Sequence, residues 1–314
     1  MSARKRTKPL IFCTASYQYM LDALAATGDF TRGKLERHRF PDGELYDRIA
    51  GNVSRRDVVL VGGTISAEDT LELYDLGSAL VKYGARSLTT VIPYFGYSTM
   101  ERAVKPGEVV KAKTRARLLS SIPPASEGNR FVLMDLHSEG IPHYFEGGAT
   151  TFHVYCKDAV KRICKRLARG GDFVLGSTDA GRAKWVESLA GDMGVSCAII
   201  LKRRIDARTT KVTGVSADVK GKIVIIYDDM IRTGGSAKMA AQAYLDAGAA
   251  KVYLICTHCL LPGDSLKGLE ESGLFAQIVV TDTHPRARDL AGQFLEVEPV
   301  GDLLARELRT GLKL

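Results

Sequence analysis

One stretch in the second half of the chain constrains the fold more than any other. It opens with the apolar run 223–227 and continues into two adjacent carboxylates, Asp228 and Asp229. The small-residue run Thr233-Gly234-Gly235-Ser236 follows, and a segment of helical composition comes after it. A continuous apolar run is typical of a parallel strand buried on both faces. The stretch therefore predicts a strand, a loop and a helix of an α/β fold.

The chemistry of this stretch suits a phosphorylated sugar. A small-residue loop that opens a helix offers backbone N–H groups and the positive end of the helix dipole to a phosphate. Two acids beside such a loop suit sugar hydroxyls or a phosphate-bound Mg²⁺. Ligands of open α/β sheets bind at the carboxyl ends of the strands. The alternative is a strand that ends in a polar turn and binds nothing.

Length and composition are those of an ordinary globular protein. The 314 residues are 45% hydrophobic and 25% charged, which fits two domains of usual size. No apolar run approaches the length of a membrane span, and the N-terminus lacks a signal-peptide core, so neither is expected. The six scattered cysteines favour reduced thiols and a cytoplasmic setting. The pair Cys256 and Cys259 is interpreted as structural, because it ends an apolar strand.

The formal net charge of +8 favours anionic partners. Aromatic residues are not interleaved with the basic ones, as a single-strand binder would require. Nucleotides and sugar phosphates are therefore preferred over nucleic acid.

Strand and helix signals alternate along the chain and contain a weak internal repeat. Residues 58–93 and 223–261 share the order strand, loop, helix, Gly-Ala and strand. At the place of Asp228 and Asp229 the first copy has Gly62 and Gly63. Two copies of one α/β domain are implied, each with a mostly parallel sheet flanked by helices. The pair Gly147-Gly148 marks the predicted boundary between a domain at 1–148 and a domain at 149–314.

Two segments lack a clear period and are expected to be loops. Residues 94–113 carry mixed charge and a Pro-Gly pair, which favours a functional or intersubunit loop. Residues 205–218 are polar and rich in threonine, and a mobile loop is predicted there.

Seven motifs occur in the order found in one known family. They are Phe40-Pro-Asp-Gly-Glu44, Pro93-Tyr-Phe-Gly-Tyr97, Asp135-Leu-His137, Ser177-Thr-Asp179, Lys202-Arg-Arg204, Asp228-Asp-Met-Ile-Arg-Thr-Gly-Gly-Ser236 and Cys256-Thr-His258. On these motifs the chain resembles the ribose-phosphate diphosphokinases, or PRPP synthetases, over nearly its whole length. The resemblance implies two tandem phosphoribosyltransferase-type domains, with the terminal segment packing back on the first. It also implies a homo-oligomer, either a dimer or a hexamer.

The resemblance implies a reaction as well. Members of the family transfer the β,γ-diphosphoryl group of ATP to the 1-hydroxyl of ribose 5-phosphate, with Mg²⁺, and release AMP. Catalysis in such a transfer comes from positioning and electrostatic stabilisation. The resemblance assigns roles to the following residues: Lys202 and Arg204 to catalysis; Asp228, Asp229, Arg232, Thr233, Gly234, Gly235 and Ser236 to ribose 5-phosphate; Phe40, Asp42, Glu44, Thr99, Arg102 and His137 to the nucleotide; His137 and Asp179 to the metal.

The chain departs from the family pattern at three places. Thr99 and Met100 stand where most members have Arg and Gln, and Arg232 stands where they have Asp. The motif Ser-Pro-Asp-x-Gly-Gly is reduced to the run at 177–182, which ends in Arg182. The changes at 99–100 and at 177–182 are similar to the plant-type class of the family. The donor is therefore left open between ATP and another nucleoside triphosphate.

Two other functions remain open at this stage. One is a catalytically silent regulatory paralogue of a synthetase, because the nucleotide loop at Thr99-Met100 is altered. The other is a phosphoribosyltransferase that uses PRPP, because the motif at 228–236 serves that chemistry too, although such an enzyme needs only one domain.

Overall fold

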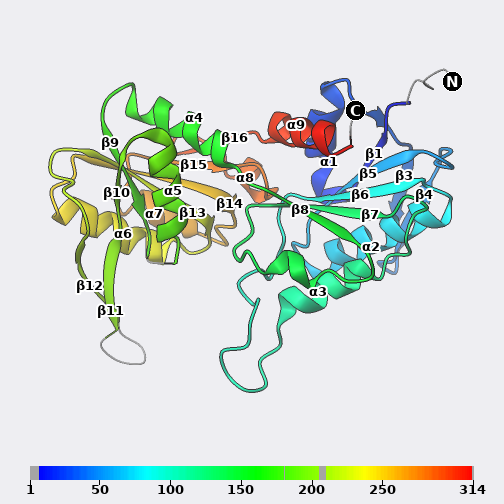
Figure 1. The fold of residues 1–314 in the computed structure, drawn as a ribbon, viewed down its shortest axis with the longest axis horizontal. Helices are drawn as coiled ribbons and strands as arrows, with labels where there is room; N and C mark the ends of the chain where they lie inside the picture. The colour runs from blue at the N-terminus through cyan, green and yellow to red at the C-terminus, as the bar shows by residue number, and fades with distance from the viewer. Residues whose placement is uncertain (1–6, 180, 205–209, 313–314) are drawn as a thin grey trace. The chain divides into compact units, whose positions relative to one another are not determined.

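The computed structural model describes residues 7–179, 181–204 and 210–312, and for 202–204, 210–213 and 312 it describes the backbone alone. The chain forms two compact units, Met1–Tyr155 with Gly301–Leu314 and Cys156–Val300 (Figure 1). No helix in the described ranges is long and apolar enough to cross a membrane.

The first unit is a parallel sheet with helices on both faces. Its strands lie in the order β2 (Thr31–Arg32), β1 (Leu10–Cys13), β5 (Asp57–Val61), β6 (Ser87–Ile92), β7 (Asn129–Met134) and β8 (Thr150–Val154). Its helices are α1 (Gln18–Ala26), α2 (Ala67–Lys82), α3 (Lys111–Ser120) and α9 (Gly301–Leu312), with short 3₁₀ turns η1 (Ala15–Tyr17) and η2 (Ile141–Tyr144). Figure 1 shows α1 and α9 on one face of the sheet and α2 and α3 on the other.

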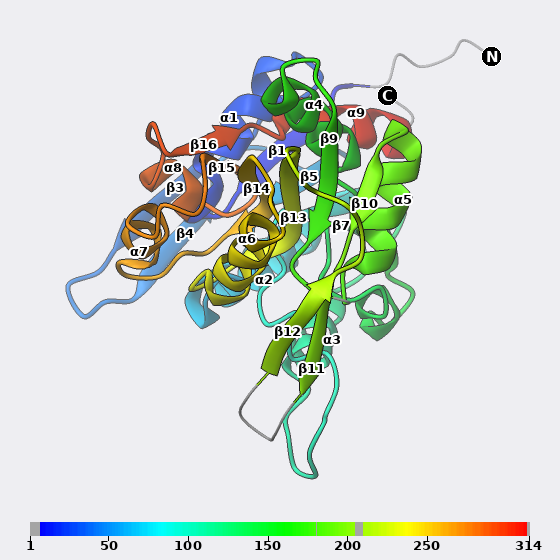
Figure 2. The same cartoon turned by 90° about the vertical axis from the view of Figure 1, so that its left-hand side faces the viewer.

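The second unit repeats this arrangement (Figure 2). Its parallel strands lie in the order β10 (Ser196–Ala198), β9 (Phe173–Ser177), β13 (Ile223–Ile231), β14 (Lys251–Cys259), β15 (Gln277–Thr281) and β16 (Leu295–Glu298). Its helices are α4 (Lys157–Ala168), α5 (Ala183–Met193), α6 (Gly235–Asp246), α7 (Ser265–Glu270) and α8 (Arg286–Asp289). The predicted fold class, two tandem α/β domains, is confirmed.

Each unit also carries an antiparallel hairpin at the same point of its topology. The first hairpin is β3 (Leu35–Arg39) with β4 (Leu45–Ile49), and the second is β11 (Ile200–Arg204) with β12 (Thr210–Val215). The loop predicted at 205–218 is therefore wrong for 210–215, where the run is rich in β-branched residues and pairs with β11. Residues 205–209 lie outside the described part.

The last helix completes the first unit. Gly301 begins α9 and packs directly on α1, where an added Cβ would lie 2.8 Å from the Cβ of Ala23. The strand β8 follows residue 148 and pairs with β7, so it extends the first sheet to Val154.

The two sheets differ at the carboxyl ends of their central strands. Register pairs Cys13 with Val61 in the first and Ser177 with Tyr227 in the second, so Gly62 and Gly63 occupy the places of the two aspartates. A Cβ on Gly62 would lie 2.7 Å from Leu73, and one on Gly63 would lie 2.5 Å from the hydroxyl of Tyr17. The ring of Tyr17 is fully buried. The first unit therefore has no room for carboxylates where the second carries them.

This packing predicts that Gly63→Ala destabilises the protein by about 1–3 kcal/mol, because the methyl group overpacks against Tyr17. Chemical denaturation measures the change. The matched control is Gly51→Ala in the same unit, where the nearest atom would lie 4.0 Å away. Its effect should stay within about 0.5 kcal/mol, as for other surface changes. Equal effects of the two substitutions would contradict this account of the first unit.

Candidate active site

The two adjacent carboxylates lie at the carboxyl end of β13, in the middle of the second sheet. Asp228 is partly exposed, whereas Asp229 is buried. The hydroxyl of Thr178 donates to Asp228 Oδ2 at 2.8 Å, and the Asp229 N–H donates to Asp228 Oδ1 at 2.9 Å. Thr178 follows β9, the strand next to β13, so two neighbouring strand ends build this part of the site.

Arg182 holds the second carboxylate. Its Nε donates to Asp229 Oδ1 at 3.0 Å, and its Nη2 lies 2.7 Å from Asp229 Oδ2. The side chains are only 14% and 2% exposed, so the pair is largely out of water. The backbone of Arg182 forms the N-cap of α5, which places the guanidinium beside the end of β13.

Burial governs the ionisation of these groups. Desolvation, followed by the neighbouring charge of Asp229, raises the pKa of Asp228, and the Thr178 hydrogen bond and Arg182 oppose the rise only partly. Burial acts to lower the pKa of Arg182, but the charge and hydrogen bond of Asp229 outweigh it, so that pKa is raised and Arg182 stays protonated.

The loop after β13 has the geometry of a phosphate site. Gly234 is the N-cap of α6 and adopts a left-handed φ of +78°. A Cβ there would lie 2.7 Å from Leu269, so glycine is needed on both counts. The first N–H groups of a helix have no partner within the helix, and α6 presents them beside the exposed residues Thr233, Gly235 and Ser236. Arg232 is exposed next to them.

Two aromatic residues support the strands that carry the site. Trp185 stacks on Tyr227 with 4.0 Å between ring centroids and 15° between planes. The hydroxyl of Tyr244 lies 3.0 Å from the carbonyl oxygen of Ser177 and 2.8 Å from that of Ala198. Tyr244 thereby ties β9 to β10 from α6. Neither Trp185 nor Tyr244 was predicted as a site residue, and no signal within the sequence shows that their side chains meet these strands.

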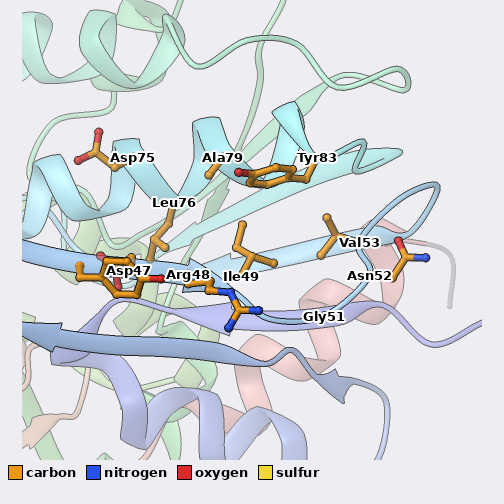
Figure 3. Close-up of a pocket in the computed structure, with 11 residues that line it drawn as sticks. Asp47, Arg48, Ile49, Gly51, Asn52, Val53, Asp75, Leu76, Ala79 and Tyr83 are labelled. Carbon is orange, nitrogen blue, oxygen red and sulfur yellow. The ribbon is translucent and has the colours of Figure 1, made fainter.

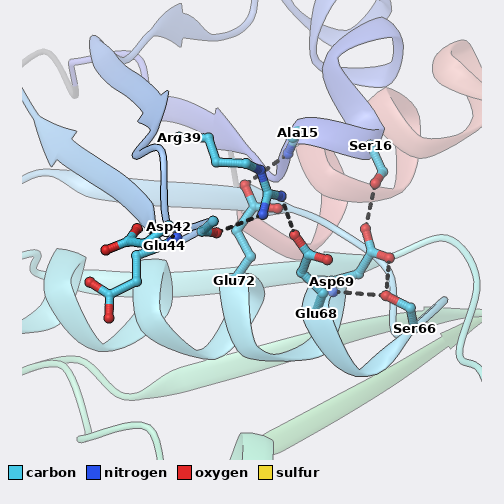
Figure 4. Close-up of polar contacts among 10 residues, drawn as sticks. Ala15, Ser16, Arg39, Asp42, Glu44, Ser66, Glu68, Asp69 and Glu72 are labelled. Atoms are coloured by element: carbon cyan, nitrogen blue, oxygen red, sulfur yellow. Dashed lines mark hydrogen bonds and ion pairs between the residues drawn. The ribbon is translucent and has the colours of Figure 1, made fainter.

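Three residues predicted to bind the nucleotide lie at the tip of the first hairpin. Phe40 is 42% exposed and packs edge-on against His38 at 4.6 Å. Asp42 accepts a hydrogen bond from the Glu44 N–H at 3.1 Å, and Arg39 donates to the Gly43 carbonyl at 2.7 Å. Figure 4 shows the carboxylates of Asp42 and Glu44 pointing away from an acidic cluster on α2, formed by Asp69 and Glu72.

That cluster ties α2 to the end of β1. Asp69 accepts hydrogen bonds from Ser16 and Ser66, and Glu72 accepts one from the Ala15 N–H at 2.9 Å (Figure 4). Burial raises the pKa of Glu72, and Arg37, 3.0 Å away, opposes this. The cluster occupies the first unit's counterpart of the sugar site, and its partners are protein groups.

Away from its tip, the hairpin is separated from α2 by a pocket. A pocket of 680 Å³ lies between β4 and α2, and Figure 3 shows Ala79 and Tyr83 on the helical side and Ile49 on the strand side. Residues 40–45 at the tip of the hairpin are all exposed, so Phe40, Asp42 and Glu44 are accessible to a ligand.

The other residues predicted on the nucleotide side lie on loops of the first unit. Thr99 and Arg102 are exposed, Arg102 at 77%. Gly96 fixes the start of this loop, because it approaches Thr64 so closely that a Cβ would lie 2.1 Å from its carbonyl oxygen. The prediction of an irregular segment at 94–113 is correct up to residue 110, and α3 begins at Lys111.

His137 is exposed on the loop after β7. The N–H of the preceding Leu136 donates to His153 Nε2 at 2.9 Å, and His153 Nδ1 lies 3.2 Å from Glu139. Asp135, buried at the start of the loop, has a strained φ of +36°. The position of His137 is therefore set by a constrained backbone.

The structure thus brings together Thr178, Asp228, Asp229 and the loop at 232–236 within the second unit. His137 belongs to the first unit and Asp179 to the second, where Asp179 Oδ1 accepts from the Gly181 N–H at 2.9 Å. Among the described residues no three acids, histidines or cysteines form a metal-binding group. The side chains of Lys202 and Arg204 lie outside the described part.

Two parallel sheets, one of which ends in paired carboxylates and the glycine loop at 232–236, define the class of phosphoribosyltransferase-type proteins. Two family models match the chain: the N-terminal domain of ribose phosphate pyrophosphokinase over residues 10–122, and the phosphoribosyl synthetase-associated domain over residues 190–309.

Relatives extend the match to most of the chain. Ribose-phosphate pyrophosphokinase of Fusobacterium nucleatum is 34% identical over 87% of this chain and 85% of that protein. The chloroplastic ribose-phosphate pyrophosphokinase 1 of Oryza sativa is 30% identical over 96% of this chain and 76% of that protein. The crystal structure of phosphoribosylpyrophosphate synthetase from Mycobacterium smegmatis superposes with a TM-score of 0.86, at 26% identity, over 98% of this chain and 99% of that one. The chain belongs to the ribose-phosphate pyrophosphokinase family of enzymes.

The electrostatics of the site predict opposite effects for two neighbouring substitutions. Asp228→Asn should stabilise the protein by about 1 kcal/mol at pH 8, because it removes a charge that burial disfavours. The folded-state pKa of Asp228 is raised above its unfolded-state value, so the penalty on the wild type builds up as the pH rises from about 4 to the folded-state pKa and is complete above it. The gain should therefore shrink as the pH falls toward about 4, the ordinary pKa of aspartate.

Asp229→Asn is the matched comparison and should destabilise by about 3 kcal/mol, because it leaves Arg182 buried without its partner. Denaturant titrations of both variants from pH 5 to pH 8 measure these changes. The same sign of effect for both variants at pH 8 would contradict the assigned electrostatics.

Proposed function

We propose that the chain is a ribose-phosphate diphosphokinase. In this proposal it transfers the β,γ-diphosphoryl group of ATP, or of another nucleoside triphosphate, to the 1-hydroxyl of ribose 5-phosphate. The products are PRPP and the nucleoside monophosphate. One observation carries the proposal: paired carboxylates and a helix-opening glycine loop lie together at the end of β13, and only the second sheet has them. Membership of the family supports the reaction.

The second domain would hold the sugar phosphate. The 5-phosphate would sit on the N-terminus of α6 and the loop Arg232, Thr233, Gly234, Gly235 and Ser236, where backbone N–H groups and a positive dipole end meet it. Asp228 and Asp229 would receive the ribose hydroxyls. Such a site fixes the sugar at two ends, which orients the 1-hydroxyl for in-line attack on the β-phosphorus.

The first domain would bind the nucleotide. Phe40 offers an exposed ring for stacking on the base, and Asp42 and Glu44 offer acceptors beside it. In the proposed dimer or hexamer this hairpin serves the site of a neighbouring subunit. Thr99 and Met100 stand in place of the family's usual Arg and Gln, and Arg102 is kept, so we leave the identity of the base open between ATP and other triphosphates.

Mg²⁺ is the proposed metal, held by His137 and Asp179 together with the phosphates. The Asp179 carboxylate is the kind of oxygen donor that Mg²⁺ prefers, and phosphate oxygens would complete the shell, whereas the His137 imidazole is a softer ligand that this ion takes less readily. Bound there, the ion would neutralise charge on the transferred group. Lys202 and Arg204 would add positive charge at the β-phosphate as the group moves. The described cysteines form no disulfide, which fits a reducing compartment such as the cytoplasm.

The purified chain, incubated with ribose 5-phosphate, Mg²⁺ and each of ATP, GTP, CTP and UTP, tests the proposal. PRPP and a nucleoside monophosphate should form in equal amounts with at least one donor. Activity of the single chain would exclude the silent regulatory paralogue. Formation of nucleotide from PRPP and a base, without any triphosphate-dependent synthesis, would instead establish a phosphoribosyltransferase.

Lys202→Ala should lower kcat by about 10²–10³ and leave the KM for ribose 5-phosphate nearly unchanged, because the lysine acts on charge that develops in the transition state. Lys251→Ala, which removes an exposed lysine at the start of β14, is the matched control and should change neither constant. A parallel rise in KM would show that Lys202 binds the substrate, against the role proposed here.

A further inference from the structure

The residue that distinguishes this acceptor site is Arg182. The family motif quoted above ends in glycine at this position, and a glycine leaves space beside the second aspartate. Here the guanidinium fills that space and makes two contacts with Asp229, at 3.0 and 2.7 Å. Both oxygens of Asp229 therefore face a cation that the chain itself supplies.

The geometry leaves part of the guanidinium available. Nη2 is buried against Asp229 Oδ2, 2.7 Å away, while the side chain as a whole keeps 14% of its surface exposed. A guanidinium has five N–H donors, more than its two contacts with Asp229 use, so its exposed part can donate to a ligand oxygen. Asp228, partly exposed and fixed by Thr178, supplies an acceptor in the same place.

The net charge of the acceptor site therefore differs from that of a site with glycine at position 182. Two ionised carboxylates beside a doubly charged sugar phosphate repel the ligand, and a divalent cation is one way to offset this repulsion. With Arg182 in place, Asp229 is already neutralised and the pair carries at most one net negative charge. The ligand meets one carboxylate and one guanidinium instead of two carboxylates.

We propose that Arg182 is a substrate-positioning residue of the acceptor site, which pairs with Asp229 and donates to a ribose hydroxyl, so that ribose 5-phosphate binds without a divalent cation. This inference rests on the proposed function for the identity of the sugar. It leaves the metal requirement of the transfer step itself unchanged, because that requirement arises at the triphosphate.

The chain contains its own reporter for this binding event. Trp185 is the single tryptophan of the sequence, and it stacks on Tyr227, the residue before Asp228. Ribose 5-phosphate binding can therefore be followed by tryptophan fluorescence without turnover, with isothermal calorimetry as an independent readout.

The experiment compares titrations with ribose 5-phosphate in EDTA and in excess Mg²⁺. For the wild type the two dissociation constants should agree within about twofold, below the fivefold or more that marks coupled ligands. Arg182→Gly should weaken binding in EDTA at least about tenfold. Mg²⁺ should then restore at least about fivefold of that loss. Arg182→Lys, which keeps the charge but loses the planar fork, should fall between the two.

Lys184→Ala is the matched control, since it removes an exposed cation from the first turn of the same helix. It should bind as the wild type does in both conditions. Because Arg182→Gly leaves Asp229 unpaired, Arg182→Gly with Asp229→Asn provides a second variant without that buried charge. In EDTA it should bind more weakly than Asp229→Asn alone, because the donor to the sugar is gone.

Two results would overturn the inference: a wild type that requires Mg²⁺ to bind ribose 5-phosphate, or Arg182 variants that bind it as wild type in EDTA. Both leave the proposed function intact if PRPP is still formed. Conversely, cation-independent binding that depends on Arg182, in a chain that forms no PRPP with any donor, would uphold the inference about the sugar site and refute the diphosphokinase.

Discussion

The buried contact between Arg182 and Asp229 is the interaction on which the carboxyl end of β13 depends. A carboxylate at the end of a fully buried strand is tolerated only when a partner compensates its charge. Arg182 provides that partner from the start of α5, and Thr178 holds the neighbouring Asp228 from β9. The strand, its neighbour and the helix are thereby fixed around a small polar centre. The loop at 232–236 follows the end of β13 directly, so its position is fixed by the same centre.

Side-chain volume explains why, among the described residues, only the second sheet has this centre. Both units share strand order and hairpins. In the first unit, however, Tyr17 fills the space that the carboxylates occupy in the second unit. Once Gly62 and Gly63 pack against Leu73 and Tyr17, no side chain fits there. The first unit instead presents Phe40, Asp42 and Glu44 on an open hairpin. One fold therefore supplies two different surfaces through a few changes in side-chain volume.

Alternating apolar runs and helical segments are enough to predict two parallel sheets, because central strands such as β5 and β13 are buried on both faces. The edge strands β8 and β16 escape such reasoning, since their partly exposed, alternating residues do not form an apolar run. The phosphate loop is predictable because its chemistry is contiguous in sequence. The contact between Arg182 and Asp229 joins residues 47 positions apart, so only the fold reveals it. The position of β12 was missed because a Thr-rich strand resembles a polar loop.

In the proposed function the sugar phosphate binds at the end of β13. A crystal structure of the protein with ribose 5-phosphate tests it most directly. The account predicts one sugar per chain, with its phosphate on the loop 232–236 and its hydroxyls beside Asp228 and Arg182. A sugar phosphate bound instead at the end of β5, or hydroxyls that turn away from both of those side chains, would contradict it.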